Sequence, residues 1–181
     1  DQAGSAYRRA IDLKTDDAMF HHQLGVVYAQ QGKKTEAIYQ QKQAIDIQPQ
    51  MSRAYHQLGL IYGQQNLWDK AISAYLTALK QNPELVESSY NLAQAYFRQG
   101  KMEEAQQQMS RYQELKSQID PINKLRGAFQ QSHDRLERAA IKSNIGRIYL
   151  QHKKFKEAIT EFQKAIGLNP RQVEAHNGIG L

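Results

Sequence analysis

The sequence predicts an all-α solenoid built from repeated pairs of helices. A pattern of small, aromatic and proline residues recurs every 34 positions, and self-similarity at such a period is typical of helical repeat arrays. Glycine (11) and proline (4) are sparse among the 181 residues, so long stretches lack helix breakers. Apolar residues within each stretch follow the helical period of 3.6 residues and do not alternate as in a strand. We therefore expect helices and no strand.

The pattern is clearest in residues 52–85. Its fixed points are Leu58, Gly59, Tyr62, Ala71, Tyr75, Ala78 and Pro83. The same types of residue occur 34 positions earlier at Leu24, Gly25, Tyr28, Ala37, Ala44 and Pro49. They occur 34 positions later at Leu92, Ala93, Tyr96 and Ala105.

This pattern resembles the tetratricopeptide repeat (TPR), whose signature is W-x2-L-G-x2-Y, then A-x3-F, then A-x4-P. The positions that match it are Tyr55, Leu58, Gly59, Tyr62, Ala71, Tyr75, Ala78 and Pro83. The resemblance implies a right-handed superhelical solenoid of helix-turn-helix repeats. First helices in this family line a concave groove that binds other proteins. The sequence does not indicate the partner or the cellular compartment.

The period divides the chain into segments. We expect the second helix of a truncated repeat in 1–17, full repeats in 18–51, 52–85, 86–119 and 139–172, an inserted helix or junction in 120–138, and the start of a further, truncated repeat in 173–181. The repeat 86–119 is degenerate in its C-terminal half, where Met109, Tyr112 and Ser117 replace the usual aromatic, alanine and proline. Because the pattern is cut at both ends, we expect this chain to be a piece of a longer protein.

Small residues at fixed positions predict close packing of the two helices in each repeat. They are Gly25, Gly59 and Gly146 on first helices and Ala37, Ala71 and Ala158 on second helices. The turns between these helices carry Gly32, Asn66, Gly100 and Lys153, where we expect the left-handed conformation. A proline at 49, 83 and 170 is expected to end each second helix.

The register breaks once, because Tyr149 follows Tyr96 by 53 positions, one period plus 19. Asp120-Pro121 has the features of a helix start, with a capping carboxylate before a proline at the first helical position. We therefore expect a separate amphipathic helix over 121–131 and another helix from Ser132.

By register, the family resemblance assigns a set of residues to the peptide-binding groove. They are His22, Gln23, Val26, Gln30, Arg53, His56, Gln57, Leu60, Gln64, Tyr90, Asn91, Gln94, Phe97, Arg98, Asn144 and Arg147. Among them, Gln23, Gln57, Asn91 and Asn144 form a row of carboxamides at one repeat position. Such a row suits the backbone of an extended peptide. Carboxamides are also common at this position for reasons internal to the helix, and both interpretations stay open.

No catalytic pattern is present in the sequence. There is no cysteine, no glycine-rich phosphate loop and no H-E-x-x-H motif. His22 and His56 lie one repeat apart, but two imidazoles without a carboxylate make a poor metal site. We therefore expect a protein that is not an enzyme, with no cofactor and no metal.

The net charge of +6 is concentrated in one repeat. Residues 139–172 hold seven basic side chains against two acidic ones, and the rest of the chain is nearly neutral. A nucleic-acid binder would spread its basic residues along a continuous stripe with interleaved aromatics. We therefore expect no nucleic-acid partner, and the lack of an 18-residue apolar run predicts no membrane insertion.

The leading functional interpretation is a non-catalytic scaffold whose groove binds an extended or helical peptide segment of a partner protein. One alternative is the substrate-presenting TPR arm of a larger enzyme, as in some glycosyltransferases. Another is a scaffold that assembles end to end, since apolar surface on the terminal helices favours self-association.

Overall fold

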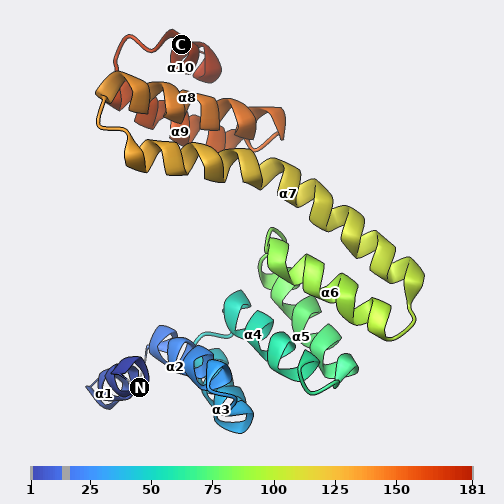
Figure 1. Ribbon diagram of the computed structural model, residues 1–181. Helices are drawn as coiled ribbons and strands as arrows, with labels where there is room; N and C mark the ends of the chain where they lie inside the picture. Colours follow the sequence, from blue (N-terminus) through green and yellow to red (C-terminus); the bar gives the residue numbers. More distant parts are fainter. Residues whose placement is uncertain (1, 14–16, 181) are drawn as a thin grey trace. The chain divides into compact units, whose positions relative to one another are not determined.

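The computed structural model describes residues 2–13 and 17–180. Within these ranges the chain forms ten helices and no strand (Figure 1), which confirms the predicted all-α fold. The helices are α1 (Gln2–Leu13), α2 (Ala18–Gln30), α3 (Lys34–Ile47), α4 (Ser52–Gly63), α5 (Trp68–Gln81), α6 (Val86–Arg98), α7 (Met102–Gln131), α8 (Arg135–Gln151), α9 (Phe155–Leu168) and α10 (Val173–Ile179).

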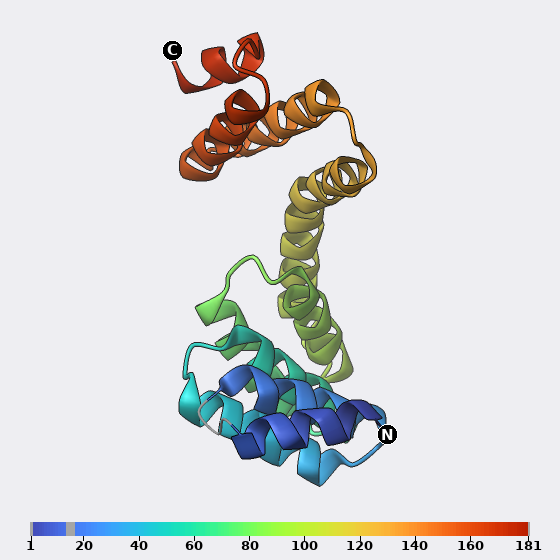
Figure 2. The same cartoon turned by 90° about the vertical axis from the view of Figure 1, so that its left-hand side faces the viewer.

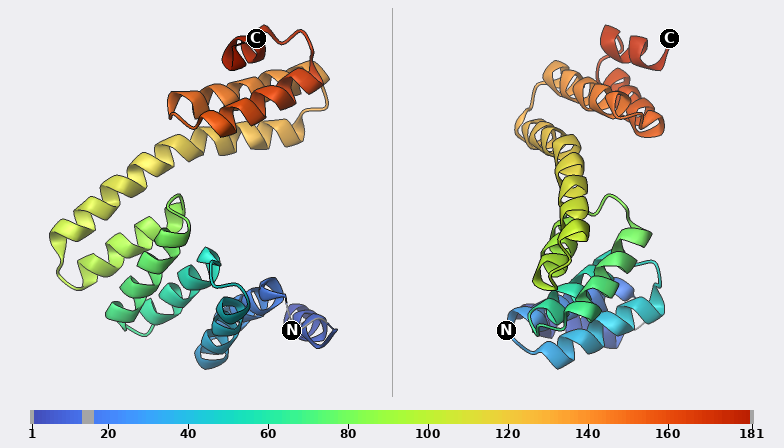
Figure 3. Two further views of the ribbon diagram at one scale, coloured as in Figure 1. Left: turned by 180° about the vertical axis from the view of Figure 1, so that it is seen from behind. Right: turned by 90° about the vertical axis from the view of Figure 1, so that its right-hand side faces the viewer.

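The chain divides into two compact units, Asp1–Gln113 and Glu114–Leu181, and the boundary falls inside α7. In unit 1, α2 packs against α3 and α4 against α5, while the first helices α2, α4 and α6 contact one another in succession (Figure 2). In unit 2, α8 and α9 lie side by side, and α10 packs against both (Figure 3). Each unit is thus a stack of helices that contact near neighbours in the sequence.

Glycine on the first helix lets the two backbones of a repeat approach closely. A Cβ atom added at Gly59 would lie 2.4 Å from Cε1 of Tyr75, and one at Gly146 would lie 2.7 Å from the ring of Phe162. The alanines predicted on the facing helices, Ala71 and Ala158, are buried. These contacts confirm the close packing expected from the small residues.

The four predicted turn positions have left-handed backbones. Gly32 and Gly100 have φ angles of 76° and 74°, and Asn66 and Lys153 have φ angles of 58° and 59°. Glycine takes this conformation without strain, whereas a residue such as lysine is disfavoured there by about 1 kcal/mol. The second helices α3, α5 and α9 end two residues before Pro49, Pro83 and Pro170, as expected.

The predicted helix start at Asp120-Pro121 is wrong, because α7 is a continuous helix of 30 residues with Pro121 inside it. The stop proline of the other repeats is replaced by Ser117, so the helix is not ended where the repeat would end. Packing then holds the helix on both sides of the proline. In unit 1 the ring of Tyr112 packs against that of Tyr90 in a tilted arrangement, with 5.1 Å between centroids, and in unit 2 Ile122 is buried in a cluster with α8.

The next helix also begins later than Ser132. Its first residue is Arg135, and Asp134 caps it by accepting a hydrogen bond of 2.7 Å from the backbone N–H of Leu136. Ser132 still belongs to the end of α7, because its backbone N–H donates to the carbonyl of Ala128 at 2.9 Å. The carboxylate of Asp134 is therefore the cap of α8, and the boundary lies later than predicted.

Candidate functional site

The predicted groove residues of unit 1 lie on the first helices α2, α4 and α6, with Gln64 just past the end of α4. The structure places them at different depths. The exposed members are Gln30, Arg53, Gln64, Tyr90, Gln94, Phe97 and Arg98, and the half-buried members are Gln23, Val26, His56, Gln57, Leu60 and Asn91. His22 is buried.

His22 belongs to the interface between α2 and α3. The Oε1 atom of Gln41 can only accept, so Nδ1 of His22 donates to it at 2.8 Å, and Nε2 of Gln41 donates back to the carbonyl of His22 at 3.0 Å. Gln41 is fully buried. Burial lowers the pKa of His22, the hydrogen bond with Gln41 acts in the opposite direction, and the charge of Arg53 lowers it further. This histidine therefore acts as a packing residue and leaves little surface for a ligand.

His56 connects three helices at the equivalent position of the next repeat. Its Nδ1 atom shares a hydrogen bond of 2.7 Å with Oγ of buried Ser88 on α6, and its ring lies 5.8 Å from that of Tyr75 on α5. Burial lowers the pKa of His56, while the nearby charge of Glu87 raises it and that of His22 lowers it. Burial thus favours the neutral form of both histidines.

An apolar pocket of about 350 Å³ opens beside the exposed side chain of Phe97. Its lining residues are Ala93, Gln94, Phe97, Met102, Ala105, Gln106 and Met109, which come from α6 and the first turns of α7. Phe97 is 53% exposed and Met102 is 58% exposed, far more than most large apolar side chains in a folded protein. The pocket combines aromatic, thioether and two carboxamide groups.

The sequence signal for this pocket lies in the degenerate half of repeat 86–119. Met109 occupies the place of Tyr75, and Ala93 occupies the place of Gly59. The pair of glycine and ring that closes repeats 52–85 and 139–172 is therefore missing here, and both substitutes line the pocket. Register alone identified Phe97 and Gln94 but missed Met102, Gln106 and Met109, because these lie on the second helix.

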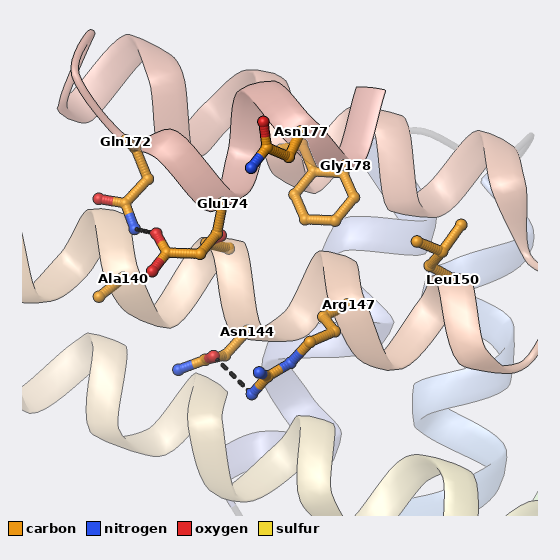
Figure 4. Close-up of a pocket in the computed structure, with 10 residues that line it drawn as sticks. Ala140, Asn144, Arg147, Leu150, Gln172, Glu174, Asn177 and Gly178 are labelled. Atoms are coloured by element: carbon orange, nitrogen blue, oxygen red, sulfur yellow. Dashed lines mark hydrogen bonds between the residues drawn. The ribbon is translucent and has the colours of Figure 1, made fainter. Parts of the chain in front are cut away.

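Asn144 and Arg147 lie in unit 2, on α8, and line a different pocket. It measures about 440 Å³ and is lined by Ala140, Ser143, Asn144, Arg147, Leu150, Phe162, Gln172, Glu174, Asn177 and Gly178 (Figure 4). The ring of Phe162 packs against two glycines, because Cβ atoms added at Gly146 and Gly178 would lie 2.7 Å and 2.4 Å from it. The residues from α10 and the segment before it were not predicted, since the sequence shows only the start of that repeat.

Part of the basic character of unit 2 is neutralised within the fold. Lys142 and Lys164 donate to opposite oxygens of buried Glu161, at 2.9 Å and 2.6 Å. Burial opposes ionisation of Glu161, but the hydrogen bonds from Lys164 and Lys142 outweigh it and hold the pKa of the carboxyl below its usual value. These two lysines are therefore structural cations.

Residues 2–13 and 17–180 lack the features of a metal centre and of a membrane-spanning helix. No three histidine or acidic side chains in these ranges lie close enough together to hold a metal ion. None of the helices there is both long and apolar enough to cross a bilayer.

Family models and solved structures identify the fold. A model described as a tetratricopeptide repeat matches residues 56–118, and a second, described as a TPR repeat, matches residues 27–66 and 146–181. No curated protein sequence matches the chain significantly.

Among solved structures, the chain is similar to YrrB, described as a TPR protein with an unusual peptide-binding site. The sequence identity is 19%, the TM-score is 0.60, and the alignment covers 99% of this chain and 100% of that one. Two crystal structures of MamA are similar at 19% identity, with TM-scores of 0.59 and 0.58. Those alignments cover 94% and 95% of this chain and 89% and 84% of the MamA chains.

At such identities the structural likeness shows the fold alone. The family assignment rests on three findings that agree: the 34-residue period, the pairs of packed helices and the matches to family models. TPR arrays are typically non-catalytic modules that bind other proteins or peptides. The chain belongs to the tetratricopeptide repeat family and folds as an all-α interaction scaffold.

Proposed function

We propose that unit 1 binds a peptide segment of a partner protein along α2, α4 and α6, with an apolar side chain of the peptide anchored beside Phe97. The observation that carries this proposal is the apolar pocket of about 350 Å³ at that residue. An exposed aromatic ring at the mouth of an apolar pocket offers a large contact area at low cost in side-chain freedom. The two methionines in the lining adapt to different anchors.

Polar groups beside the pocket suit a peptide backbone. Gln23, Gln57 and Asn91 are half-buried at one repeat position on successive first helices. A carboxamide donates and accepts at once, so it pairs with a backbone whatever the neighbouring side chains are. Val26 and Leu60, also half-buried, supply apolar surface along the same row. Binding of this kind requires no terminal carboxylate on the peptide.

The proposal is tested by selecting peptides from a displayed library with the full chain and measuring their affinity by fluorescence polarisation. We expect dissociation constants in roughly the micromolar range. Phe97→Ala should weaken binding about 30-fold, as expected for a central aromatic anchor, with smaller losses for Leu60→Ala and Asn91→Ala.

Leu76→Ala is the matched control, because Leu76 is an exposed apolar residue on α5 and lies outside the proposed groove. Circular dichroism of each variant verifies that the fold is kept. Unchanged affinity in Phe97→Ala, Leu60→Ala and Asn91→Ala would contradict binding along these helices.

A second candidate is self-association through exposed apolar side chains near the ends of the described chain. Leu13 on α1 is 89% exposed and Val173 on α10 is 64% exposed. Sedimentation velocity tests this candidate, since association should weaken in Leu13→Gln and Val173→Gln. A monomer at all concentrations would exclude it.

A further inference from the structure

The pocket between α8 and α10 in unit 2 shares no residue with the proposed peptide site of unit 1. Its apolar part is formed by Ala140 and Leu150, with the buried ring of Phe162 beneath them. Its volume of about 440 Å³ falls within the range of sites that hold a ligand side chain or a small molecule. Polar groups line it on two sides, one belonging to α8 and the other to α10 with the segment before it (Figure 4).

The α8 side carries a positive charge held in place by an amide. Nη2 of Arg147 donates to Oδ1 of Asn144 at 3.0 Å, one turn earlier on the same helix. The guanidinium has four further N–H donors, and the amide group of Asn144 retains its NH2. This side therefore presents hydrogen-bond donors and a cation to whatever enters the pocket.

The α10 side carries a negative charge held by a relay of amides. Nε2 of Gln172 donates to Oε2 of Glu174 at 2.8 Å, and Nδ2 of Asn169 donates to Oε1 of Gln172 at 3.2 Å. The carboxylate of Glu174 keeps acceptor sites beyond this bond. This side therefore presents an anion and acceptors.

From this arrangement we infer that unit 2 holds a second binding site, which takes a peptide segment with an apolar side chain flanked by one acidic and one basic residue. The apolar side chain lies against Ala140 and Leu150, the acidic residue pairs with Arg147, and the basic residue pairs with Glu174. A wholly acidic segment is repelled by Glu174 and a wholly basic one by Arg147. The pair of opposite charges thus selects against both.

This selectivity differs from that proposed for unit 1, where the pocket lining holds carboxamides and no charged side chain. Charge at the edge of an interface affects specificity and association rate more than affinity. The chain would then recognise two segments by different rules, one by apolar anchoring and one by charge pattern.

The test uses the full chain and synthetic peptides, acetylated and amidated, with glycine on both sides of a central triplet. The triplets are Glu-Leu-Lys, Lys-Leu-Glu, Gln-Leu-Lys, Glu-Leu-Gln, Gln-Leu-Gln, Glu-Leu-Glu and Lys-Leu-Lys. We expect one order of the mixed triplet to bind best, and replacement of either charge by an amide to weaken binding about threefold. Binding should be unchanged in Phe97→Ala, which separates this site from the one in unit 1.

Variants of Arg147 and Glu174 show which of the two residues causes each charge preference of the site. Arg147→Gln should abolish discrimination between Glu and Gln in the peptide, and Glu174→Gln should abolish discrimination between Lys and Gln. Lys156→Gln and Glu157→Gln are the matched controls, because both residues are exposed on α9 outside this pocket. Equal binding of all seven peptides would overturn the inference, as would a charge preference that survives both pocket variants or disappears equally in the controls.

Discussion

The repeats 18–51 and 52–85 solve the same packing problem with different chemistry. In both, a glycine on the first helix faces a large planar group on the second, and an added Cβ would lie 2.4 Å from it. The group is the Tyr75 ring opposite Gly59 and the Gln41 amide opposite Gly25. The backbone spacing therefore requires a planar group of suitable size but does not require it to be apolar. The amide, however, must have a partner, and His22 supplies it.

This comparison extends to the degenerate repeat. With Ala93 and Met109 in these two places, neither a ring nor an amide fills the gap, and the apolar pocket beside Phe97 appears. One pair of positions thus determines whether a repeat is closed by an aromatic ring, closed by a polar pair or left with an open pocket. Substitutions at these positions test that conclusion.

The largest effect is expected for Gly59→Ala. The new methyl group would overlap the ring of Tyr75, which is buried and cannot move without shifting α5. We expect the free energy of unfolding to fall by about 2–3 kcal/mol, as for overpacked cores. Chemical unfolding followed by circular dichroism measures the loss, and hydrogen exchange locates it. A loss below about 0.5 kcal/mol would show that the ring adjusts and that the spacing is not fixed.

Gln41→Leu should cost somewhat less, about 2 kcal/mol, because it leaves the Nδ1–H of buried His22 without its acceptor. The companion variant Gln41→Tyr recreates the residue type of the next repeat at this position. A double-mutant cycle with His22→Leu measures the coupling between the two side chains. Additive effects would show that the hydrogen bonds contribute little and that the two repeats differ only in shape.

Acidification should weaken the interfaces around His22 and His56 by a smaller amount, because the protonation of the histidines changes while their packing partners remain. Burial holds the pKa of His22 and His56 below 6.5, so the unfolded chain binds protons first as the pH falls. Their contribution to stability is complete above that pH and is lost as the pH decreases through the folded-state pKa values. Hydrogen exchange at pH 7 and pH 5 should show faster opening of α2 to α5 at the lower pH, and His22→Gln with His56→Gln should reduce the difference.

His152→Gln is the control for the pH experiment, since this histidine is exposed at the end of α8. An equal change in pH dependence in this variant would assign the effect to charge in general. The repeat interfaces would then have no special role in it.

The smallest effect, and of opposite sign, is expected for Gly127→Ala in α7. Among the described residues nothing lies within 4 Å of a Cβ at this position, so this glycine faces no planar group. Alanine should stabilise the helix by about 0.5–1 kcal/mol, because it reduces the freedom of the unfolded chain. Thermal unfolding monitored at 222 nm measures the gain. A loss of stability would show that small residues serve a purpose in this fold beyond close packing.

Much of the fold was predictable because the repeat imposes the same local requirements many times. Gly32, Gly100 and Asn66 marked the turns correctly, and even Lys153 was placed by register against its own preference. The continuity of α7 was not predictable in this way. Pro121 has the local features of a helix start, and they were overridden by the missing stop at position 117 and by packing of Tyr112 and Ile122 on either side.

The candidate site was predictable only where one helix determines it. Register identified Phe97, but the pocket beside it depends on Met102 and Met109 of the following helix. Register also assigned His22 to the groove, whereas the structure buries it against Gln41. The sequence did contain a signal for the burial of His22, because Gln41 stands where the next repeat has the aromatic Tyr75. A buried amide needs a partner, and a histidine on the facing helix is a natural one.

The ring of Phe162, in contact with Gly146 of its own repeat and Gly178 of the next helix, links two steps in the folding of unit 2. In a linear array, stability is a sum of terms within repeats and terms between neighbours. This ring contributes to both terms, so docking of α10 and formation of the α8–α9 pair stabilise each other. Truncation to alanine would weaken both couplings together, and α10, only seven residues long, would be the first helix to fray.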